Sequence, residues 1–399
     1  MAGPPAADPH GGNRIAIARR LGCRPEQLLE ASASLVPFPA PAALRRRLRS
    51  GLGGSARWGL GSGAAPSPLR DYPDRGYGAL RQVIAAHHGL DPAAVLPGNG
   101  AAELFTWAAR DAAASGISLL PTPGFADYRR ALACWGAPWR PLPLPLAWSA
   151  QFPQPFPLEA MGGWPADLAA ADAGVLWVTN PHNPSGQLWS RASLEPLLER
   201  CALLIVDEAF LPLLPDGEAQ SLVPLLADHA NLVVIRSLTK LFAIAGLRLG
   251  YALAGPQRLA RWSAWRDPWP VNGLAALAGE TLLADGAALA RWLERVRSWV
   301  AREGPWLAAR LAAVDGLVPL PSAANFLLVR GEAAGQPLPL EPLRLRLQDH
   351  HRILLRDCRS FERLGESWLR IALLDRQGNR RLLRALEREA AGGRPPAPR

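Results

Sequence analysis

Two neighbouring stretches decide the fold: LLIVDEAF at 203–210 and VVIRSLTKLFAIAGLRLGY at 233–251. Each begins with a short, near-continuous apolar run, which is typical of a strand buried on both faces of a parallel sheet. Polar residues follow directly, with Asp207 after the first run and Ser237 and Lys240 after the second. In such sheets ligands bind beyond the carboxyl ends of the strands, so we expect these residues to share a binding site.

The same alternation of apolar runs and helical patterns extends along the chain. We expect buried strands at 117–120, 174–179, 203–207, 232–237 and 249–254, and helices at 101–114 and 190–201. Short strands separated by helices predict an α/β architecture with a mostly parallel sheet flanked by helices. Two later runs, Asn325–Arg330 and Trp368–Leu373, predict strands of a second, smaller α+β domain.

Three stretches have the composition of irregular chain. Residues 51–70 are rich in Gly, Ser and Pro and predict a flexible loop, residues 137–165 predict extended segments around a short strand, and residues 391–399 predict a disordered tail. A chain of 399 residues is longer than one core usually supports. We expect four parts: an N-terminal arm with part of the small domain (1–70), the large domain (71–270), a connecting helix with the rest of the small domain (271–390), and the tail (391–399).

Composition argues against several classes of protein. The formal charge of +10 comes from scattered arginines without a zinc-finger or RNA-binding signature, so we expect no nucleic-acid partner. The longest apolar runs are too short to cross a bilayer and the N-terminus lacks a signal-peptide pattern, so we expect no membrane partner. The cysteines form no CxxC pair, which predicts neither a metal site nor a disulfide framework and favours a cytoplasmic location. They are Cys23, Cys134, Cys201 and Cys358.

The second stretch combines a phosphate cradle with a reactive amine. Ser237, Thr239 and Arg248 offer two hydroxyls and one bidentate cation for a phosphate. Lys240 lies among them, where desolvation and a nearby cation would lower its pKa and make it a nucleophile for a carbonyl carbon. Asp207 is expected either to face a protonated ring nitrogen or to serve as a helix N-cap or salt-bridge partner.

Three further motifs accompany these stretches. NPHNPSG at 180–186 predicts a rigid turn in which Asn183 can bond a planar ligand. GNGAAE at 98–103 predicts a glycine turn whose following helix start binds phosphate through free backbone N–H groups. TPGFADY at 122–128 places Phe125 either on an aromatic ring or in the core.

The order G-N-G, P-G-F, N-P-H-N-P-S-G, D-E-A-F and S-L-T-K…R resembles the fold-type I aminotransferase family over nearly the whole chain. The resemblance implies a large domain with a seven-stranded sheet, a smaller domain and pyridoxal 5'-phosphate as cofactor. It assigns cofactor binding to Tyr72, Gly100, Ala101, Ala102, Phe125, Asn183, Asp207, Ser237, Thr239, Lys240 and Arg248.

Among these residues the resemblance makes Lys240 and Asp207 catalytic. Lys240 would hold the cofactor as a Schiff base, and Asp207 would keep the ring nitrogen protonated. Asn183 would bond the phenolic oxygen of the ring, and Phe125 would stack on the ring. Tyr72 would reach the phosphate of a neighbouring subunit, which implies a homodimer with shared active sites.

Within the family the likeness is greatest to the enzymes that decarboxylate L-threonine O-3-phosphate for cobalamin biosynthesis, giving (R)-1-amino-2-propanol O-2-phosphate. HGGN at 10–13, EASASLVP at 30–37 and RILLRDCRSF at 352–361 carry this likeness. It implies substrate-binding roles for His10, Gly11, Ser34, Asn183, Arg356 and Arg370. Two arginines and a histidine suit a substrate that bears both a phosphate and a carboxylate. The chain departs from these enzymes at Ser34, where they have asparagine.

Other functions remain open at this point. Histidinol-phosphate aminotransferase shares the cofactor site and also binds a phosphorylated amine, and phosphoserine is another conceivable substrate. His10 is also compatible with a disordered terminus, and Arg356 is also compatible with a surface cation. A non-catalytic binding protein that keeps the fold is the alternative from another class, against which the intact Lys240, Asp207 and Arg248 argue.

Overall fold

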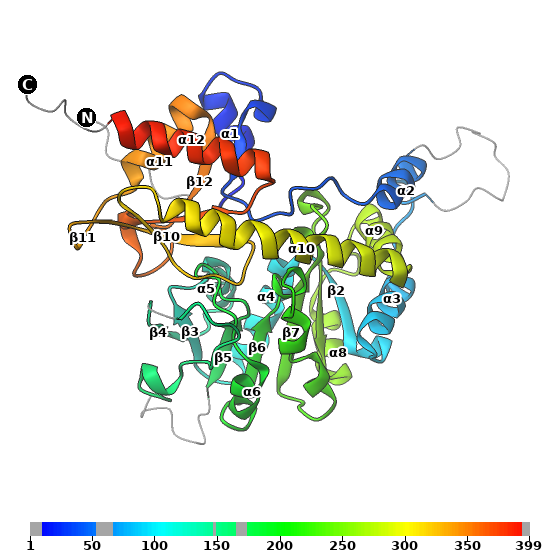
Figure 1. Ribbon diagram of the computed structural model, residues 1–399. Helices are drawn as coiled ribbons and strands as arrows, with labels where there is room; N and C mark the ends of the chain where they lie inside the picture. The colour runs from blue at the N-terminus through cyan, green and yellow to red at the C-terminus, as the bar shows by residue number, and fades with distance from the viewer. Residues whose placement is uncertain (1–9, 53–66, 147–148, 165–173, 393–399) are drawn as a thin grey trace, which may run out of the picture.

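A seven-stranded sheet forms the centre of the larger part of the molecule (Figure 1). The structure, a computed structural model, describes residues 10–52, 67–146, 149–164 and 174–392. The strands follow the order β2 (Val95–Asn99), β8 (Leu249–Ala254), β7 (Leu232–Ser237), β6 (Leu203–Asp207), β5 (Val175–Thr179), β3 (Ser118–Thr122) and β4 (Trp139–Pro143). β8 runs antiparallel to β2 and β7, and the remaining neighbours are parallel. The predicted seven-stranded, mostly parallel sheet is therefore confirmed.

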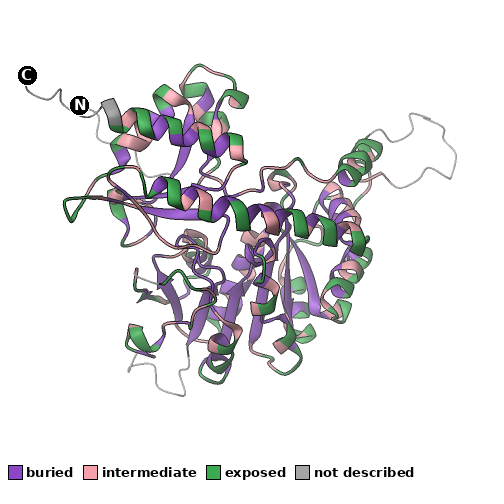
Figure 2. Cartoon of the chain, viewed as in Figure 1, coloured by how far each residue is buried: buried purple, intermediate pink, exposed green. Residues whose placement is uncertain are grey.

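Both faces of this sheet are buried, as the continuous apolar strands require. In β6, Leu203 and Ile205 belong to one hydrophobic core and Leu204 and Val206 to another, because successive side chains point to opposite faces. The helices over the first face are α4 (Ala101–Ala113), α5 (Ala126–Ala133) and α8 (Pro256–Trp265), and those over the second are α3 (Gly78–His88), α9 (Gly273–Leu283) and α10 (Gly286–Leu311). Figure 2 shows the resulting layers, with buried strands between helices whose outer sides are exposed.

A second sheet forms the smaller part. Its strands follow the order β1 (Leu29–Ala31), β12 (Ile353–Asp357), β13 (Trp368–Ala372), β10 (Phe326–Ala333) and β11 (Gln336–Pro337), with β9 (Leu317–Pro319) paired to β10. The helices of this part are α1 (Arg14–Arg20), α11 (Glu341–His351) and α12 (Arg376–Gly392). The 26-residue helix α10 runs from the large part to this sheet (Figure 1). β1 comes from the N-terminal segment, so the small sheet joins both ends of the chain.

Local chemistry explains where the secondary structure departs from the predictions. The helix expected at 190–201 is only one turn, α6 (Arg191–Leu194), continued by a 3-10 helix at Glu195–Glu199. Pro196, the second residue of that 3-10 helix, has no N–H to donate to the carbonyl four residues earlier, which interrupts the α-helical pattern. The expected loop at 51–70 begins later than predicted, since α2 (Ala42–Leu52) includes its first two residues, and α12 likewise includes the first two residues of the expected tail. Residues 53–66 and 393–399 lie outside the described residues.

Within the described residues, no single helix has the length and apolar composition needed to cross a membrane. The bent pair α9 and α10, with 90° between them, meets that criterion by length and composition alone.

Candidate active site

A cavity of about 560 Å³ opens at the carboxyl ends of β6 and β7, where the large sheet meets the small one. Most of the residues that the sequence predicts for the site line it: His10, Gly11, Ser34, Ala101, Ala102, Phe125, Asn183, Asp207, Ser237, Thr239, Lys240, Arg248, Arg356 and Arg370. They come from segments spread along the chain, so the fold assembles the site from residues as far apart as 10 and 370.

Lys240 lies in the single-turn helix α7 (Leu238–Leu241) that follows β7. Ser237 caps this turn by accepting a hydrogen bond from the backbone N–H of Thr239, which fixes where the lysine leaves the strand. Burial and then the charge of Arg248 lower the pKa of the lysine to about 8. A substantial fraction of the amine is therefore neutral near pH 8, as a carbonyl nucleophile must be.

Asp207 ends β6 and is 6% exposed. Burial raises the pKa of its carboxyl to about 6, while hydrogen bonds from the Tyr128 hydroxyl (2.7 Å) and the Ala209 backbone N–H (3.0 Å) oppose that rise. The carboxylate faces the same cavity as Lys240 and has a cation, Lys240, within electrostatic range. A buried acid of this kind is suited to pair with a protonated nitrogen of a bound ligand.

The start of α4 and Arg248 form an anion-binding corner. Gly100 precedes the helix with φ +73° and no side chain caps the helix, so the backbone N–H groups of Ala101 and Ala102 point outward. The N–H of Gly100 itself donates to the Gly98 carbonyl, so it is not one of the expected phosphate donors. A Cβ on Gly100 would lie 2.4 Å from the Arg248 guanidinium, which shows how closely the backbone approaches this cation.

Arg370 projects from β13 into the cavity beside the Asn-Pro turn. Its Nη1 donates to the Asn183 Oδ1 and its Nη2 donates to the Ser32 carbonyl (3.2 Å). Burial and then the neighbouring Arg356 lower the pKa of Arg370 to about 9. A guanidinium held this way, beside a second cation, attracts an anionic group of a ligand.

Arg356 and His10 complete the far wall of the cavity. Arg356 on β12 is the register partner of Arg370 and is 4% exposed, donating to the Asp357 carbonyl and to Ser360 Oγ. His10 lies 3.3 Å from the carboxylate of Asp127, and its ring contacts that of Phe125 edge-on. The alternative of a surface cation at Arg356 is therefore wrong.

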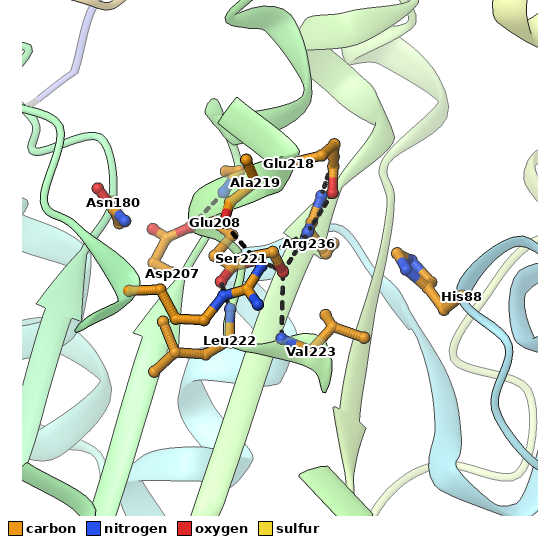
Figure 3. Close-up of polar contacts among 12 residues, drawn as sticks. His88, Asn180, Asp207, Glu208, Glu218, Ala219, Ser221, Leu222, Val223 and Arg236 are labelled. Atoms are coloured by element: carbon orange, nitrogen blue, oxygen red, sulfur yellow. Dashed lines mark hydrogen bonds and ion pairs between the residues drawn. The ribbon is translucent and has the colours of Figure 1, made fainter. Parts of the chain in front are cut away.

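Behind the catalytic edge, a buried ionic cluster connects β6 to β7. Arg236, the residue before Ser237, donates two hydrogen bonds to Glu218 and lies 2.6 Å from a carboxylate oxygen of Glu208, the residue after Asp207. Ser221 bridges Arg236 and Glu208. Figure 3 shows the two carboxylates converging on the guanidinium next to Asp207. The cluster fixes the two strand ends that carry Asp207 and Lys240.

Tyr72 is the one predicted residue whose side chain lies away from this cavity, among the residues that the structure describes. It is 78% exposed and stacks on Trp269 with ring centroids 4.3 Å apart. Both rings line a separate surface groove together with Asn272. Tyr72 therefore does not line the cavity of its own chain.

Several residues that line or support the cavity were not predicted from the sequence. Tyr128 follows Phe125 by one helical turn, and that spacing was the available signal that both rings face the sheet. Ser32 and Glu30 also line the cavity, as do Arg14 and Phe361. Glu30, Ser32 and Phe361 lie within two motifs that carry the family likeness, so those motifs were the available signal.

The residues present fit pyridoxal phosphate. The amine with a lowered pKa, the buried carboxylate and the phosphate corner share one cavity, and the cofactor needs each of them. The substrate end also has unused bonding capacity, because Ser34 Oγ, Glu30 Oε2 and Arg370 Nε are buried without hydrogen-bond partners.

Comparisons with known proteins agree with this geometry. Residues 62–386 match the family model described as aminotransferase class I and II. The chain is 35% identical to a threonine-phosphate decarboxylase of Salmonella typhimurium, covering 96% of this chain and 97% of that protein. It is 33% identical to a histidinol-phosphate aminotransferase of Symbiobacterium thermophilum, covering 84% and 87%. The crystal structure of L-threonine-O-3-phosphate decarboxylase from Porphyromonas gingivalis has the same fold, with TM-score 0.72 at 24% identity over 90% of this chain and 99% of that one.

The matched residues include the amine, the acid and the phosphate corner of the cavity, so the chain belongs to the aminotransferase class I and II family and is a pyridoxal-phosphate enzyme of fold type I.

Proposed function

We propose that the protein removes the carboxylate of L-threonine O-3-phosphate as CO₂ and leaves (R)-1-amino-2-propanol O-2-phosphate. The observation that carries this proposal is the pair of buried arginines, Arg356 and Arg370, which are register partners and face the cavity of Lys240. Two fixed cations together with His10 complement a small substrate that has two anionic groups. The relative in Salmonella is named for this reaction.

Each residue has a distinct part in the cofactor site. Lys240 would bond the cofactor's aldehyde, Asp207 would hold the proton on the ring nitrogen, and Asn183 would donate to the phenolic oxygen. Phe125 would stack on the ring. The phosphate would be held by Ser237, Thr239, Arg248 and the N–H groups of Ala101 and Ala102. When bound, pyridoxal phosphate supplies an electron sink for the pair left behind as a bond to the substrate's Cα breaks.

The substrate anchors decide which bond to Cα breaks. Which bond breaks depends on how the substrate is oriented, so the residues that hold it would select the reaction. Arg370 would hold the substrate carboxylate, and Arg356 and His10 would hold the phosphate, which together would fix the orientation of the Cα–carboxylate bond. The carboxylate leaves as CO₂, and Lys240 Nζ delivers one proton to Cα, which balances the reaction.

The second candidate is amino transfer to a 2-oxo acid, since histidinol-phosphate aminotransferases are also relatives. Histidinol phosphate has a phosphate but no carboxylate, so it would use only one of the two buried arginines. Phosphoserine differs from phosphothreonine by a methyl group and is the alternative substrate for decarboxylation, giving ethanolamine phosphate.

The test compares the three substrates with one preparation of holoenzyme. Phosphothreonine, phosphoserine and histidinol phosphate are each supplied with and without 2-oxoglutarate, and CO₂ and amine products are measured. We expect CO₂ from phosphothreonine without 2-oxoglutarate. An absolute requirement for 2-oxoglutarate with no CO₂ would reject decarboxylation. Arg370→Lys should raise KM for phosphothreonine because lysine cannot form the two-pronged contact, whereas Arg330→Lys, on the exposed side of the same sheet, should not.

We also propose that the protein is a cytoplasmic homodimer whose product serves cobalamin biosynthesis. The exposed Tyr72–Trp269 stack, outside the cavity of its own chain, supports an interface with a second subunit. The four cysteines are unpaired, which suits a reducing compartment. The proposed large domain, 71–270, contains all seven strands of the large sheet.

A further inference from the structure

Ser32 lies at the junction of three segments that form the substrate end of the cavity. Its hydroxyl donates to Glu30 Oε1 and accepts the backbone N–H of Gly12 (2.9 Å). Its carbonyl accepts from Nη2 of Arg370 (3.2 Å). The hydroxyl of this buried residue therefore contacts the N-terminal segment, and its carbonyl contacts Arg370 near the other end of the chain.

Close packing makes this junction intolerant of displacement. A Cβ on Gly11 would lie 2.2 Å from the Ser32 carbonyl oxygen, so the N-terminal segment rests directly against the acceptor of Arg370. Glu30 holds the turn in place, since its Oε1 also accepts the backbone N–H groups of Ser32 (2.8 Å) and Ala33 (3.2 Å). We call residues 10–13 the arm and residues 30–33 the turn.

We propose that Ser32 is a positioning residue that couples docking of the arm to the orientation of Arg370. The hydroxyl of Ser32 holds the arm, and its carbonyl holds Arg370, so both anchors are aligned by a single turn. This inference deepens the proposed function and rests on it: the arm carries His10 toward the substrate phosphate while Arg370 binds the carboxylate. A rigid connection between the two anchors fixes the distance between the two anionic groups that the site accepts.

Coupling between two sites is reciprocal, which gives a test that needs no substrate. In ligand-free protein, hydrogen exchange of the Gly12 amide is measured by NMR or by mass spectrometry of the arm peptide. Ser32→Ala should accelerate this exchange about fivefold to tenfold, because a typical hydrogen bond is lost. Ser32→Thr keeps the hydroxyl and should restore protection. Ser118→Ala, which removes a buried hydroxyl bonded to Trp177, is the matched control and should leave the arm unchanged.

The decisive variant changes the other end of the connection. Arg370→Gln cannot reach the Ser32 carbonyl, so exchange at Gly12 should also accelerate although residue 370 is remote from the arm in sequence. Arg330→Gln, an arginine of the same sheet that contacts Glu332, should have no effect. Unchanged exchange at Gly12 in Arg370→Gln, with unaltered thermal unfolding, would overturn the coupling.

Kinetics of the holoenzyme then separate this inference from the proposed function. Deletion of residues 1–12 and Ser32→Ala should each raise KM for phosphothreonine more than they lower kcat. The KM of the combined variant should exceed that of the deletion alone by less than about twofold, because the hydroxyl acts through the arm. Fully additive effects would contradict the inference. Absence of any decarboxylation by the wild-type protein would reject the proposed function, while the exchange measurements would still test the coupling.

Discussion

At the scale of single residues, Lys240 has a property that makes its ionisation directly measurable: it is the only lysine in the sequence. Its pKa of about 8 results from burial and the charge of Arg248. Labelling of cofactor-free protein with an amine-reactive reagent should therefore rise with pH along a curve with its midpoint near 8. Intact mass counts at most one side-chain amine, and peptide analysis distinguishes Lys240 from the N-terminus.

The control for this prediction is Arg248→Gln, which removes the nearby cation. Its labelling midpoint should move upward, toward the ordinary lysine value of 10.5. A wild-type midpoint near 10.5 would show that the ammonium is not desolvated in the cavity.

Asp207 supports a second prediction at this scale, because its pKa is raised to about 6 from an ordinary value of 3.8. The folded cofactor-free protein binds this proton more tightly than the unfolded chain, so the stabilisation is complete below pH 3.8 and is lost as pH rises to about 6. The thermal midpoint of the wild-type protein, compared with that of Asp207→Asn, should therefore fall as the pH rises from 3.8 to about 6. Tyr128→Phe removes a hydrogen bond that lowers the pKa, so it should extend the fall to higher pH. Parallel thermal profiles of wild type and Asp207→Asn would contradict the assignment.

At the scale of secondary-structure elements, the Arg236 cluster holds the ends of β6 and β7 together. Arg236→Met would leave the buried Glu208 and its partly exposed neighbour Glu218 without their cation, and should lower the free energy of unfolding by about 3–5 kcal/mol. Chemical denaturation measures this loss. Arg200→Met breaks an exposed ion pair with Glu159 and should cost less than about 1 kcal/mol. Equal effects of the two substitutions would show that the cluster is not what connects the strands.

The elements also show what sequence could predict. The bounds of β6, β7 and β8 were predicted to the residue, because a strand buried on both faces is a continuous apolar run ended by polar residues. The order of motifs then indicated which strand ends meet at the site. The prediction of a long helix at 190–201 was wrong, because one proline interrupts an otherwise helical pattern.

The residues that sequence could not predict are those defined by distant partners. Tyr128 matters because it donates to Asp207, 79 positions later, and Ser32 because it accepts from Arg370, 338 positions later. No local pattern encodes such a pair. Ser34 was predicted from the family likeness, whereas its unpartnered Oγ is a feature that only the structure shows.

At the scale of the whole molecule, Tyr72 leads to a prediction about assembly. An aromatic side chain that is 78% exposed, stacked on Trp269 and outside its own cavity is placed to act on a second copy of the chain. We therefore expect a dimer by analytical ultracentrifugation. We also expect Tyr72→Ala to weaken cofactor binding, because the tyrosine would contact the phosphate in the partner's cavity. The labelling curve of Lys240 in cofactor-free protein should not change, since its pKa depends on burial and on Arg248.

Mixing two variants with different defects, at a cofactor concentration too low to saturate Tyr72→Ala, distinguishes a shared site from a mere interface. Lys240→Ala lacks the amine and Tyr72→Ala lacks the phosphate contact, so each homodimer carries one defect in both sites. In a mixed dimer, one site receives the intact Lys240 of one subunit and the intact Tyr72 of the other, while the second site has both defects. Random exchange at equal concentrations should therefore restore about a quarter of the wild-type sites. If Tyr72 acted within its own chain, every site of a mixed dimer would keep one defect, and mixing would restore no activity.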